Sequence, residues 1–300
     1  MSDLPAQLRV AVEATTGSRV AAARPVAGGD VNAAFRVDLA DDRALFVKHA
    51  PDAPEGAYRI EAAGLAWLAE AKALRTPAVV ALGNATGSRF LALEWIDGAA
   101  PVGAARAGAS AESFGRALAA LHLHGAPCFG LGEDNLIAGL PQPNGPCDTW
   151  ADFYAERRLE PLARRAVARG RLAAGFLTRL DRLRPRLAEL CGPAEPPARL
   201  HGDLWSGNAA IDGAGAPVVF DPAVHGGHRE IDLAMMRLFG GFPDATFAAY
   251  AEVHPLADGH GERVELFQLA PILVHVCLFG GGYARSAERI VARYLTGAVG

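Results

Sequence analysis

The sequence has little lysine, no paired cysteines and no excess of basic charge. Of its 29 basic residues only Lys48 and Lys72 are lysines, and the rest are arginines. The four cysteines form no Cys-x-x-Cys pair, which disfavours a disulfide framework or a zinc site and favours reduced thiols in the cytoplasm. The 33 acidic residues outnumber the basic ones, so no global basic field indicates a nucleic-acid partner.

Long apolar runs are also missing. The longest, residues 269–280, is shorter than a bilayer-spanning helix and is interrupted by Pro271 and His275, so we predict a buried helix and no membrane partner. The N-terminus shows no charged region followed by an apolar stretch, which predicts no signal peptide and a cytoplasmic protein. With 300 residues, 51% of them hydrophobic, the chain has enough apolar surface for one two-lobed domain or two small ones.

Acidic and amide side chains gather between residues 199 and 222. A His-Gly-Asp tripeptide ends at Asp203, Asn208 follows five residues later, and Asp221 comes after a turn and a short apolar strand. Oxygen ligands that converge beside a free carboxylate are what Mg²⁺-dependent phosphoryl transfer needs. We therefore predict that Asp203 accepts the proton of a substrate hydroxyl, and that Asn208 and Asp221 hold the metal that bridges the phosphates of ATP. The alternative is a glycine-rich hairpin whose polar residues only cap turns.

A lysine stands on one of the strands expected near the N-terminus. The alternation of residues 44–49 places Lys48 on the face opposite Leu45, where a compact ammonium would suit phosphate oxygens. A lysine that only extends its head to solvent from the strand end is the alternative. Glu61, in a helix expected at 57–75, lies beside the apolar stripe and could reach Lys48. Otherwise it is a solvated glutamate in the first turn of that helix.

Gly28 and Gly29 form a turn between two apolar segments of strand character. A Gly-Gly turn allows the backbone to approach a ligand closely, so this turn is a candidate nucleotide-covering loop. It lacks the full Gly-x-Gly-x-x-Gly pattern and is no Walker motif, which leaves a plain hairpin as the alternative.

A change of composition marks the expected boundary between two lobes. Residues 98–110 are rich in Ala, Gly and Pro, so we predict a nucleotide-binding lobe at 1–97 and a catalytic and substrate-binding lobe at 98–300. The backbone of Glu94 and Ile96, just before this stretch, is the natural place for an adenine edge to bind.

The second lobe is predicted to be mostly helical. Residues 125–149 are dense in Gly and Pro, and a loop of this length inside a compact domain is usually functional. Residues 156–189 hold ten arginines against four acids, which indicates a solvated helical face or a surface for an anionic partner. Asp232 is expected to brace the catalytic loop by hydrogen bonds.

Taken together, these motifs resemble the fructosamine-3-kinase (ketosamine-3-kinase) family, within the aminoglycoside-phosphotransferase and protein-kinase-like group. The resemblance covers nearly the whole chain. It is carried by His-Gly-Asp-Leu-Trp-Ser-Gly-Asn at 201–208, Phe-Asp-Pro-Ala at 220–223, Gly-His-Arg-Glu-Ile-Asp-Leu-Ala-Met at 227–235, Phe-Gly-Gly-Phe at 239–242, Asp-Asn-Leu-Ile at 134–137, Pro-Gln-Pro-Asn at 141–144, Trp150 and Arg158-Leu159.

The resemblance implies an α+β, two-lobed kinase-like fold: a small lobe with an antiparallel sheet and one helix, then a larger helical lobe. It also implies an enzyme that uses ATP and Mg²⁺ to phosphorylate the 3-hydroxyl of fructosamine- or ribulosamine-type adducts, free or protein-bound, after which the product decomposes and frees the amine. Carried over, the family's roles are a catalytic base at Asp203, metal ligands at Asn208 and Asp221, ATP contacts at Lys48, Gly28 and Gly29, a Lys48 partner at Glu61, and substrate contacts at Trp205, Asp134 and Asn135. A packing aromatic is the alternative for Trp205.

The sequence departs from the family at one place and leaves two other functions open. Many members carry a cysteine directly after the nucleotide-loop glycines, linked with redox control, where this chain has Asp30. One alternative is a related kinase acting on an aminoglycoside, choline or homoserine, and the other is a nucleotide-binding pseudokinase. The oligomeric state is not predicted.

Overall fold

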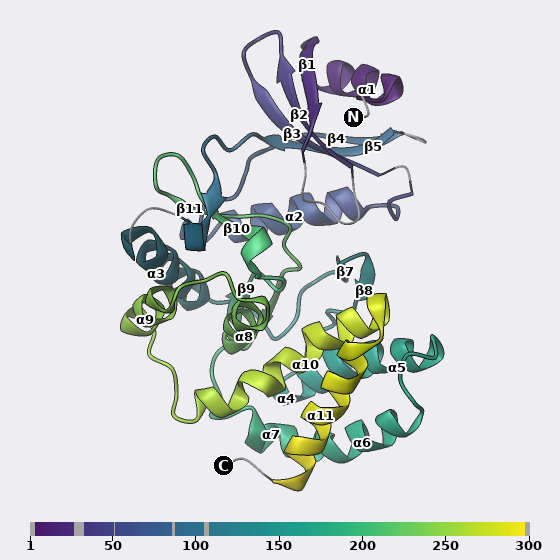
Figure 1. Ribbon diagram of the computed structural model, residues 1–300, viewed down its shortest axis with the longest axis vertical. Helices are drawn as coiled ribbons and strands as arrows, with labels where there is room; N and C mark the ends of the chain where they lie inside the picture. The colour runs from purple at the N-terminus through teal and green to yellow at the C-terminus, as the bar shows by residue number, and fades with distance from the viewer. Residues whose placement is uncertain (1–3, 27–32, 51, 86–87, 105–107, 298–300) are drawn as a thin grey trace.

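A computed structural model describes residues 4–26, 33–50, 52–85, 88–104 and 108–297. The chain forms two lobes, with a small sheet-containing lobe at the top of Figure 1 and a larger helical lobe below it. The α+β kinase-like class predicted from the sequence is confirmed. The lobe boundary after residue 97 stays a prediction.

A five-stranded antiparallel sheet forms the small lobe, in the spatial order β1-β2-β3-β5-β4. The strands are β1 (Val20–Pro25), β2 (Ala33–Leu39), β3 (Ala44–His49), β4 (Val79–Ala85) and β5 (Ser88–Glu94).

One helix covers each face of this sheet, and the alternation of β3 explains the division. Leu45 and Val47 pack with α1 (Ala6–Thr16) in one apolar cluster. Phe46 packs on the opposite face with α2 (Ala57–Ala69). Lys48 shares this second face with Phe46, as the alternation predicts.

Helix α2 is shorter than the sequence predicted. The apolar periodicity extends to residue 75, but the helix ends at Ala69. Lys72 then adopts a φ of +51°, in the left-handed region that a helix cannot continue through.

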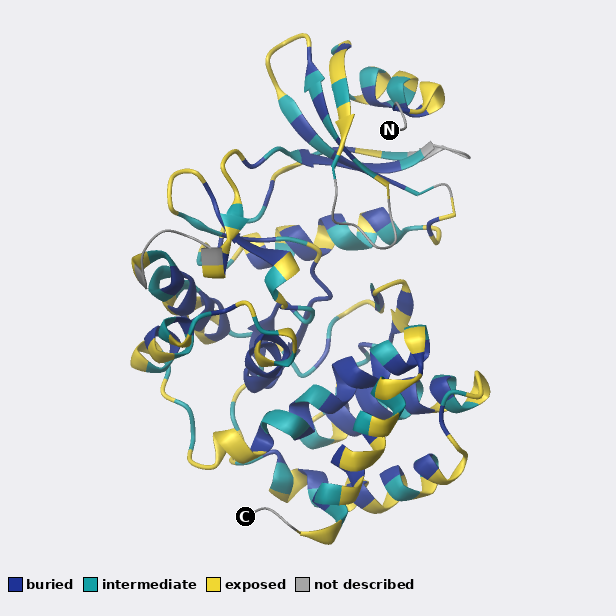
Figure 2. Ribbon diagram, viewed as in Figure 1, coloured by how far each residue is buried: buried dark blue, intermediate teal, exposed yellow. Residues whose placement is uncertain are grey.

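Ten helical segments, besides short 3₁₀ turns, form the described part of the larger lobe. They are α3 (Gly108–His124), α4 (Trp150–Phe153), a π-helical turn (Tyr154–Leu159), α5 (Glu160–Ala168), α6 (Gly175–Leu183), α7 (Leu187–Leu190), α8 (Glu230–Phe239), α9 (Asp244–Val253), α10 (His260–Phe279) and α11 (Gly282–Thr296). The predicted buried helix at 269–280 is the apolar half of α10, which lies in the core of this lobe (Figure 2). Among the described residues, no helix combines the length and apolar character needed to cross a membrane.

Short strands between the lobes carry the candidate catalytic residues. Strands β11 (Pro217–Val219), β10 (Ala209–Ile211) and β6 (Ala100–Pro101) form one sheet, and β12 (His225–Gly227) pairs with β9 (Ala198–Leu200). Asp203 lies between β9 and β10, and Asp221 lies between β11 and β12. Because the two sheets share these connections, they bring both aspartates to the same side of the larger lobe.

The expected long loop at 125–149 contains a hairpin of β7 (Asn135–Ile137) and β8 (Leu140–Gln142).

Several arginines of the 156–189 region have structural partners. Arg169 donates to the Cys277 carbonyl at 2.8 Å, Arg171 donates to the Val276 carbonyl at 3.4 Å, and Arg186 contacts carbonyls at the end of α11. Because the last carbonyls of a helix lack intrahelical partners, these arginines cap α10 and α11, and this use explains part of the basic excess.

Candidate active site

The loop that carries Asp203 is held from below by a buried carboxylate. Asp232, on α8, accepts hydrogen bonds from the backbone N–H of His201 at 2.8 Å and of Gly202 at 2.9 Å, and from His122 Nε2 at 3.2 Å. Burial alone would raise the pKa of Asp232, but the hydrogen bond and charge of His122, the charge of His201 and the Gly202 amide hold it below its ordinary value. The predicted bracing role of Asp232 is confirmed.

A glycine is required where this loop turns. Gly202 has a φ of +84°, and a Cβ there would lie 2.0 Å from the Ala223 carbonyl oxygen. The loop therefore passes directly against the segment that follows Asp221.

Asp203 itself lies in a surrounding that favours its neutral form. Burial raises the pKa of Asp203 to about 7, against the opposing effect of a hydrogen bond from Asn208. The Asn208 Nδ2 group donates to the backbone oxygen of Asp203 at 2.9 Å and to its Oδ2 at 3.3 Å. A carboxyl that titrates near neutrality suits a general base, because it can take up a proton and release it at the working pH.

Lys48 reaches the same region from the small lobe. Its Nζ donates to Glu61 Oε1 at 2.8 Å and also contacts Asp221 Oδ1, while the whole lysine is only 7% exposed. The predicted pairing of Lys48 with Glu61 is therefore present, and the amine is not on the outer surface. Asp221 adopts a φ of +52°, a costly conformation for a non-glycine residue that is typically found at functional sites.

The two segments that carry Asn208 and Asp221, the residues expected to hold Mg²⁺, lie side by side. The Phe220 N–H donates to the Asn208 carbonyl at 2.9 Å, which ties Asn208 to the strand end that carries Asp221. Within the described ranges, no group of three or more His, Cys, Asp and Glu side chains could hold a metal by itself. This donor set fits Mg²⁺, which usually keeps several waters and binds through one or two carboxylates and the phosphates of its substrate.

Some of the other predicted nucleotide contacts lie outside the described residues, and the rest lie at the end of β5. Gly28, Gly29 and Asp30 lie outside the described residues, between β1 and β2. The N–H groups of Glu94 and Trp95 are used inside the sheet, bonding Ala78 and Ala44, and Ile96 is the second residue after β5. The Glu94 side chain pairs with Arg75 and is not offered to a ligand. The candidates for adenine are therefore the Glu94 carbonyl and the Ile96 backbone, and this contact stays a prediction.

The predicted substrate residues differ in how accessible they are. Trp205 is 36% exposed and lies two residues after Asp203. The Asp134 carboxylate accepts a hydrogen bond of 2.8 Å from the Asn144 N–H, which links the two ends of the segment between these residues. The substrate contact predicted for Asn135 stays a prediction, and the structure gives this residue other partners. Asn135 is 6% exposed, its Nδ2 donates to the Val224 carbonyl at 2.7 Å, and its Oδ1 accepts from Gln142 Nε2 at 2.7 Å.

Gln142 is a residue that the sequence argument missed. Its Nε2 also donates to the Ala223 carbonyl at 3.1 Å, so the Asn135–Gln142 amide pair grips the backbone directly after Asp221 and Pro222. The sequence signals were the two motifs that contain these amides, Asp-Asn-Leu-Ile at 134–137 and Pro-Gln-Pro-Asn at 141–144, but they assigned no role to Gln142. We assign the amide pair a positioning role, because it fixes the backbone of the segment that begins with Asp221.

Helix α2, which carries Glu61, is fastened to the larger lobe. Arg199, on β9, pairs with Glu70 at 2.9 Å, contacts the Trp67 carbonyl and stacks its guanidinium 4.2 Å from the Trp67 ring centroid. A Cβ at Gly64 would lie only 3.1 Å from Pro222, so the middle of the helix packs closely against the segment after Asp221.

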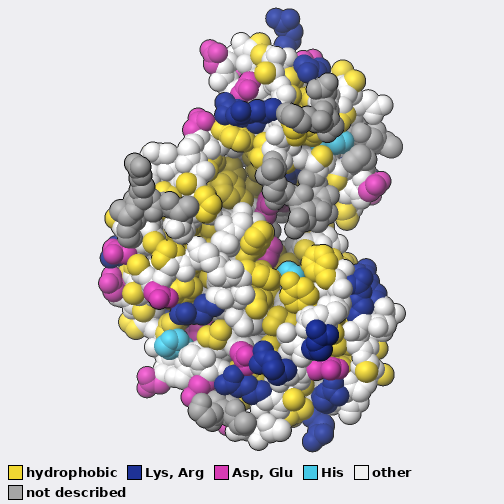
Figure 3. All heavy atoms as spheres, viewed as in Figure 1, with side chains coloured by type: hydrophobic (Ala, Val, Ile, Leu, Met, Phe, Trp, Pro, Cys, Tyr) yellow, Lys and Arg dark blue, Asp and Glu magenta, His cyan; other side chains and the backbone are white. Residues whose placement is uncertain are grey.

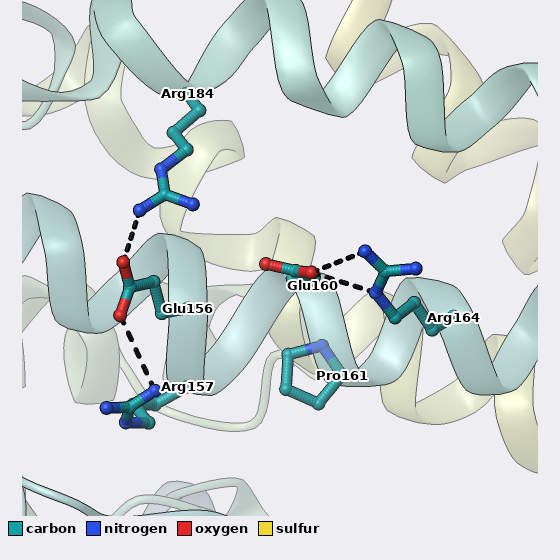
Figure 4. Close-up of a pocket in the computed structure, with 6 residues that line it drawn as sticks. All are labelled: Glu156, Arg157, Glu160, Pro161, Arg164 and Arg184. Atoms are coloured by element: carbon teal, nitrogen blue, oxygen red, sulfur yellow. Dashed lines mark hydrogen bonds and ion pairs between the residues drawn. The ribbon is translucent and has the colours of Figure 1, made fainter.

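A shallow hollow on the helical lobe is a different feature (Figure 4). It is lined by Glu156, Arg157, Glu160, Pro161, Arg164 and Arg184. Its two glutamates are neutralised by arginines, with Arg164 2.7 Å from Glu160 and Arg157 3.5 Å from Glu156. None of the candidate catalytic residues lines it.

A sequence model of the fructosamine kinase family matches residues 5–297. The chain belongs to the fructosamine kinase family. It is 38% identical over 288 residues to a Synechocystis protein named a probable ketoamine kinase, covering 95% of this chain and 94% of that one. It is 35% identical to the protein-ribulosamine 3-kinase of Arabidopsis thaliana, covering 90% of this chain and 81% of that one.

Solved structures support the same family and a wider fold group. A Thermobifida fusca protein classed as a fructosamine-3-kinase superposes with a TM-score of 0.85 at 43% identity, over 96% of this chain and 98% of that one. The aminoglycoside phosphotransferase APH(4)-Ia, in a ternary complex with ADP and hygromycin B, superposes with a TM-score of 0.64 at 17% identity, over 98% and 99%. This second likeness shows the shared fold alone.

Proposed function

We propose that the protein is an ATP-dependent kinase that phosphorylates the 3-hydroxyl of ketosamines of the fructosamine and ribulosamine type, and that this step leads to deglycation. The single observation that carries the proposal is the convergence of Asp203, Asn208, Asp221 and the Lys48–Glu61 pair between the lobes of a chain of this family.

In this reaction the Asp203 carboxylate orients the sugar hydroxyl and takes its proton as the oxygen forms a bond to the γ-phosphorus of ATP. The bond between that phosphorus and the bridging oxygen breaks, and ADP leaves with the electron pair. Lys48, held straight by Glu61, places a positive charge where phosphate oxygens would lie. Asn208 and Asp221 would hold Mg²⁺, which when bound neutralises the charge that develops on the phosphates.

Positioning supplies most of the catalysis in this proposal, since phosphoryl transfer asks little covalent chemistry of the protein. We place the protein in the cytoplasm, a proposal that the free thiols of Cys128, Cys147, Cys191 and Cys277 support.

The test is an acceptor panel with ATP and Mg²⁺. Fructosamine, ribulosamine and erythrulosamine compounds are compared with an aminoglycoside, choline and homoserine by ADP release, and the phosphorylated carbon is located by NMR. We expect turnover of at least one ketosamine with phosphate on the 3-oxygen, and its loss when Mg²⁺ is chelated. Turnover of another acceptor alone would refute the assignment. If none of these compounds is phosphorylated although the protein binds the nucleotide, the proposed activity is refuted and a pseudokinase is favoured.

A further inference from the structure

Five aromatic side chains form a continuous surface that starts at the catalytic loop. This aromatic shelf consists of Trp205, Phe239, His275, Phe279 and Tyr283. The Trp205 and Phe239 rings meet edge to face with their centroids 6.4 Å apart, and Phe239 lies 4.9 Å from His275. His275 in turn lies 5.7 Å from Phe279 and 4.9 Å from Tyr283.

The shelf is open to solvent in a protein that buries its other large aromatics at least in part. Eight large hydrophobic side chains of the described residues are exposed, and the three aromatic ones among them all belong to the shelf. Phe279 is 63% exposed, Phe239 39% and Trp205 36%. Figure 3 shows hydrophobic side chains gathered around a histidine on this face, below the hollow between the lobes. Exposed rings that touch one another in this way mark a binding surface.

Glycines lie next to three of the shelf aromatics. A Cβ at Gly207 would lie 2.3 Å from the Trp205 indole, so the ring packs directly over this glycine. Gly240 follows Phe239 with φ 69° and ψ −159°, and Gly280 follows Phe279 with φ 67° and ψ −138°. Such conformations are essentially limited to glycine, and here they end α8 and α10 directly after the exposed rings.

We propose that the aromatic shelf binds the substituent on the nitrogen of the ketosamine and selects adducts of amines that carry an aromatic or long apolar group. The inference rests on the proposed function and specifies its substrate class. In a ketosamine the nitrogen is bonded to carbon 1 and the reacting hydroxyl to carbon 3, so the nitrogen substituent leaves the sugar close to the reacting oxygen. With that oxygen at Asp203, the nearest exposed side chain of the shelf is two residues along the chain, at Trp205.

The chemistry of the rings matches this occupant. The secondary amine of a ketosamine is protonated at neutral pH, and an ammonium is attracted to aromatic faces. His275 Nδ1 donates to the Pro271 carbonyl at 2.8 Å, so its Nε2, when neutral, can accept a hydrogen bond from the ammonium. Beyond the nitrogen, Phe279 and the ring of Tyr283 offer apolar area next to the Tyr283 hydroxyl, and the two ring centroids lie 6.3 Å apart. This arrangement favours a flat or long apolar substituent over a small one.

The test compares the N-benzyl and N-methyl ketosamines of the same sugar. We expect wild-type kcat/KM to favour the benzyl adduct about tenfold. Phe279→Ser should reduce this preference about three- to tenfold, mostly through KM, because the ring binds substrate and transition state alike. Since Phe279 is mostly exposed, the substitution leaves the core intact. Leu123→Ser is the matched control, since Leu123 is 54% exposed on α3 and outside the shelf, and it should keep the wild-type preference.

The outcomes separate the two proposals. If the methyl adduct is phosphorylated and the benzyl adduct is not preferred, or if Phe279→Ser leaves the preference unchanged, the shelf inference is overturned and the proposed function stands. If neither adduct is phosphorylated, the shelf inference is overturned, and the acceptor panel alone decides the proposed function. If Phe279→Ser instead changes the molecular mass seen by light scattering and lowers both activities equally, the shelf is an interface between copies of the chain and the inference is overturned.

Discussion

Lys48 Nζ donates a hydrogen bond of 2.8 Å to Glu61 Oε1 and thereby joins strand β3 to helix α2. The same ammonium touches Asp221, a candidate metal ligand. Glu61 therefore shares the charge of Lys48 with Asp221 and keeps the lysine from pairing with that carboxylate alone.

Glu61→Ala should raise KM for ATP about tenfold, because Lys48 would then pair with Asp221 and be withdrawn from the phosphates. Steady-state kinetics with varied ATP at fixed Mg²⁺ measures the effect. Glu55→Ala is the control, since Glu55 is an exposed glutamate just before the same helix. An unchanged KM in Glu61→Ala would show that the pairing does not serve nucleotide binding.

The pH dependence of kcat/KM should reflect the ionisation of Asp203. Burial raises the pKa of Asp203 to about 7, and only its deprotonated form can accept the hydroxyl proton. We expect kcat/KM for the acceptor to fall about tenfold per pH unit below pH 7 and to level off above it. A profile that stays flat down to pH 5 would contradict the assignment of Asp203 as the base.

Asp203→Asn should abolish turnover, by about 10³-fold or more, and leave nucleotide binding largely intact. It should also stabilise the fold at pH 8. Between pH 3.8 and about 7 the folded Asp203 keeps a proton that the unfolded chain loses, so its contribution to stability falls as pH rises through this window. Asparagine has no such titration, so we expect a gain of about 1–3 kcal/mol at pH 8 and a much smaller difference at pH 4. Thermal unfolding at both pH values measures it, and near-normal turnover would refute the role of base.

The amide pair of the β7–β8 hairpin should matter for the metal. Gln142→Leu removes the donor to Ala223 and Asn135, which frees the backbone after Asp221. We expect a three- to tenfold higher Mg²⁺ concentration for half-maximal activity and a loss of about 1–3 kcal/mol of stability. Gln7→Leu, at an exposed position of α1, is the control. A loss of stability with unchanged Mg²⁺ dependence would limit Gln142 to a purely structural role.

Gly207→Ala should act through Trp205. A Cβ at this position would lie 2.3 Å from the indole, so the ring must move and kcat/KM for the acceptor should fall about tenfold. In a Trp205→Ala background the same substitution should have almost no further effect, which a double-mutant cycle measures. Additive losses would show that Gly207 acts on the loop independently of the indole.

The sequence predicted what depends on local pattern. The alternation of β3 placed Lys48, and the short spacing from Asp203 to Asn208 predicted the catalytic loop. It could not predict contacts between distant segments. Asn135 bonds a carbonyl 89 residues away, so its buried structural use was invisible in the sequence. Phe239 and Phe279 end apolar helices and fit a core pattern, and only their packing reveals that they are exposed.

The attachment of α2 to the larger lobe determines how the cleft can widen. Arg199 holds the helix at Glu70 and Trp67, and Pro222 lies against Gly64. A small lobe that swings away as a rigid unit would break all of these contacts at once. A movement that leaves the helix in place and slides the sheet across it would keep these contacts, but it would shear the apolar packing of Phe46 on the helix and break the bridge from Lys48 to Glu61. Departure of the spent nucleotide would then depend on this ion pair together with that apolar contact, and weakening the pair would speed release even as it weakens capture.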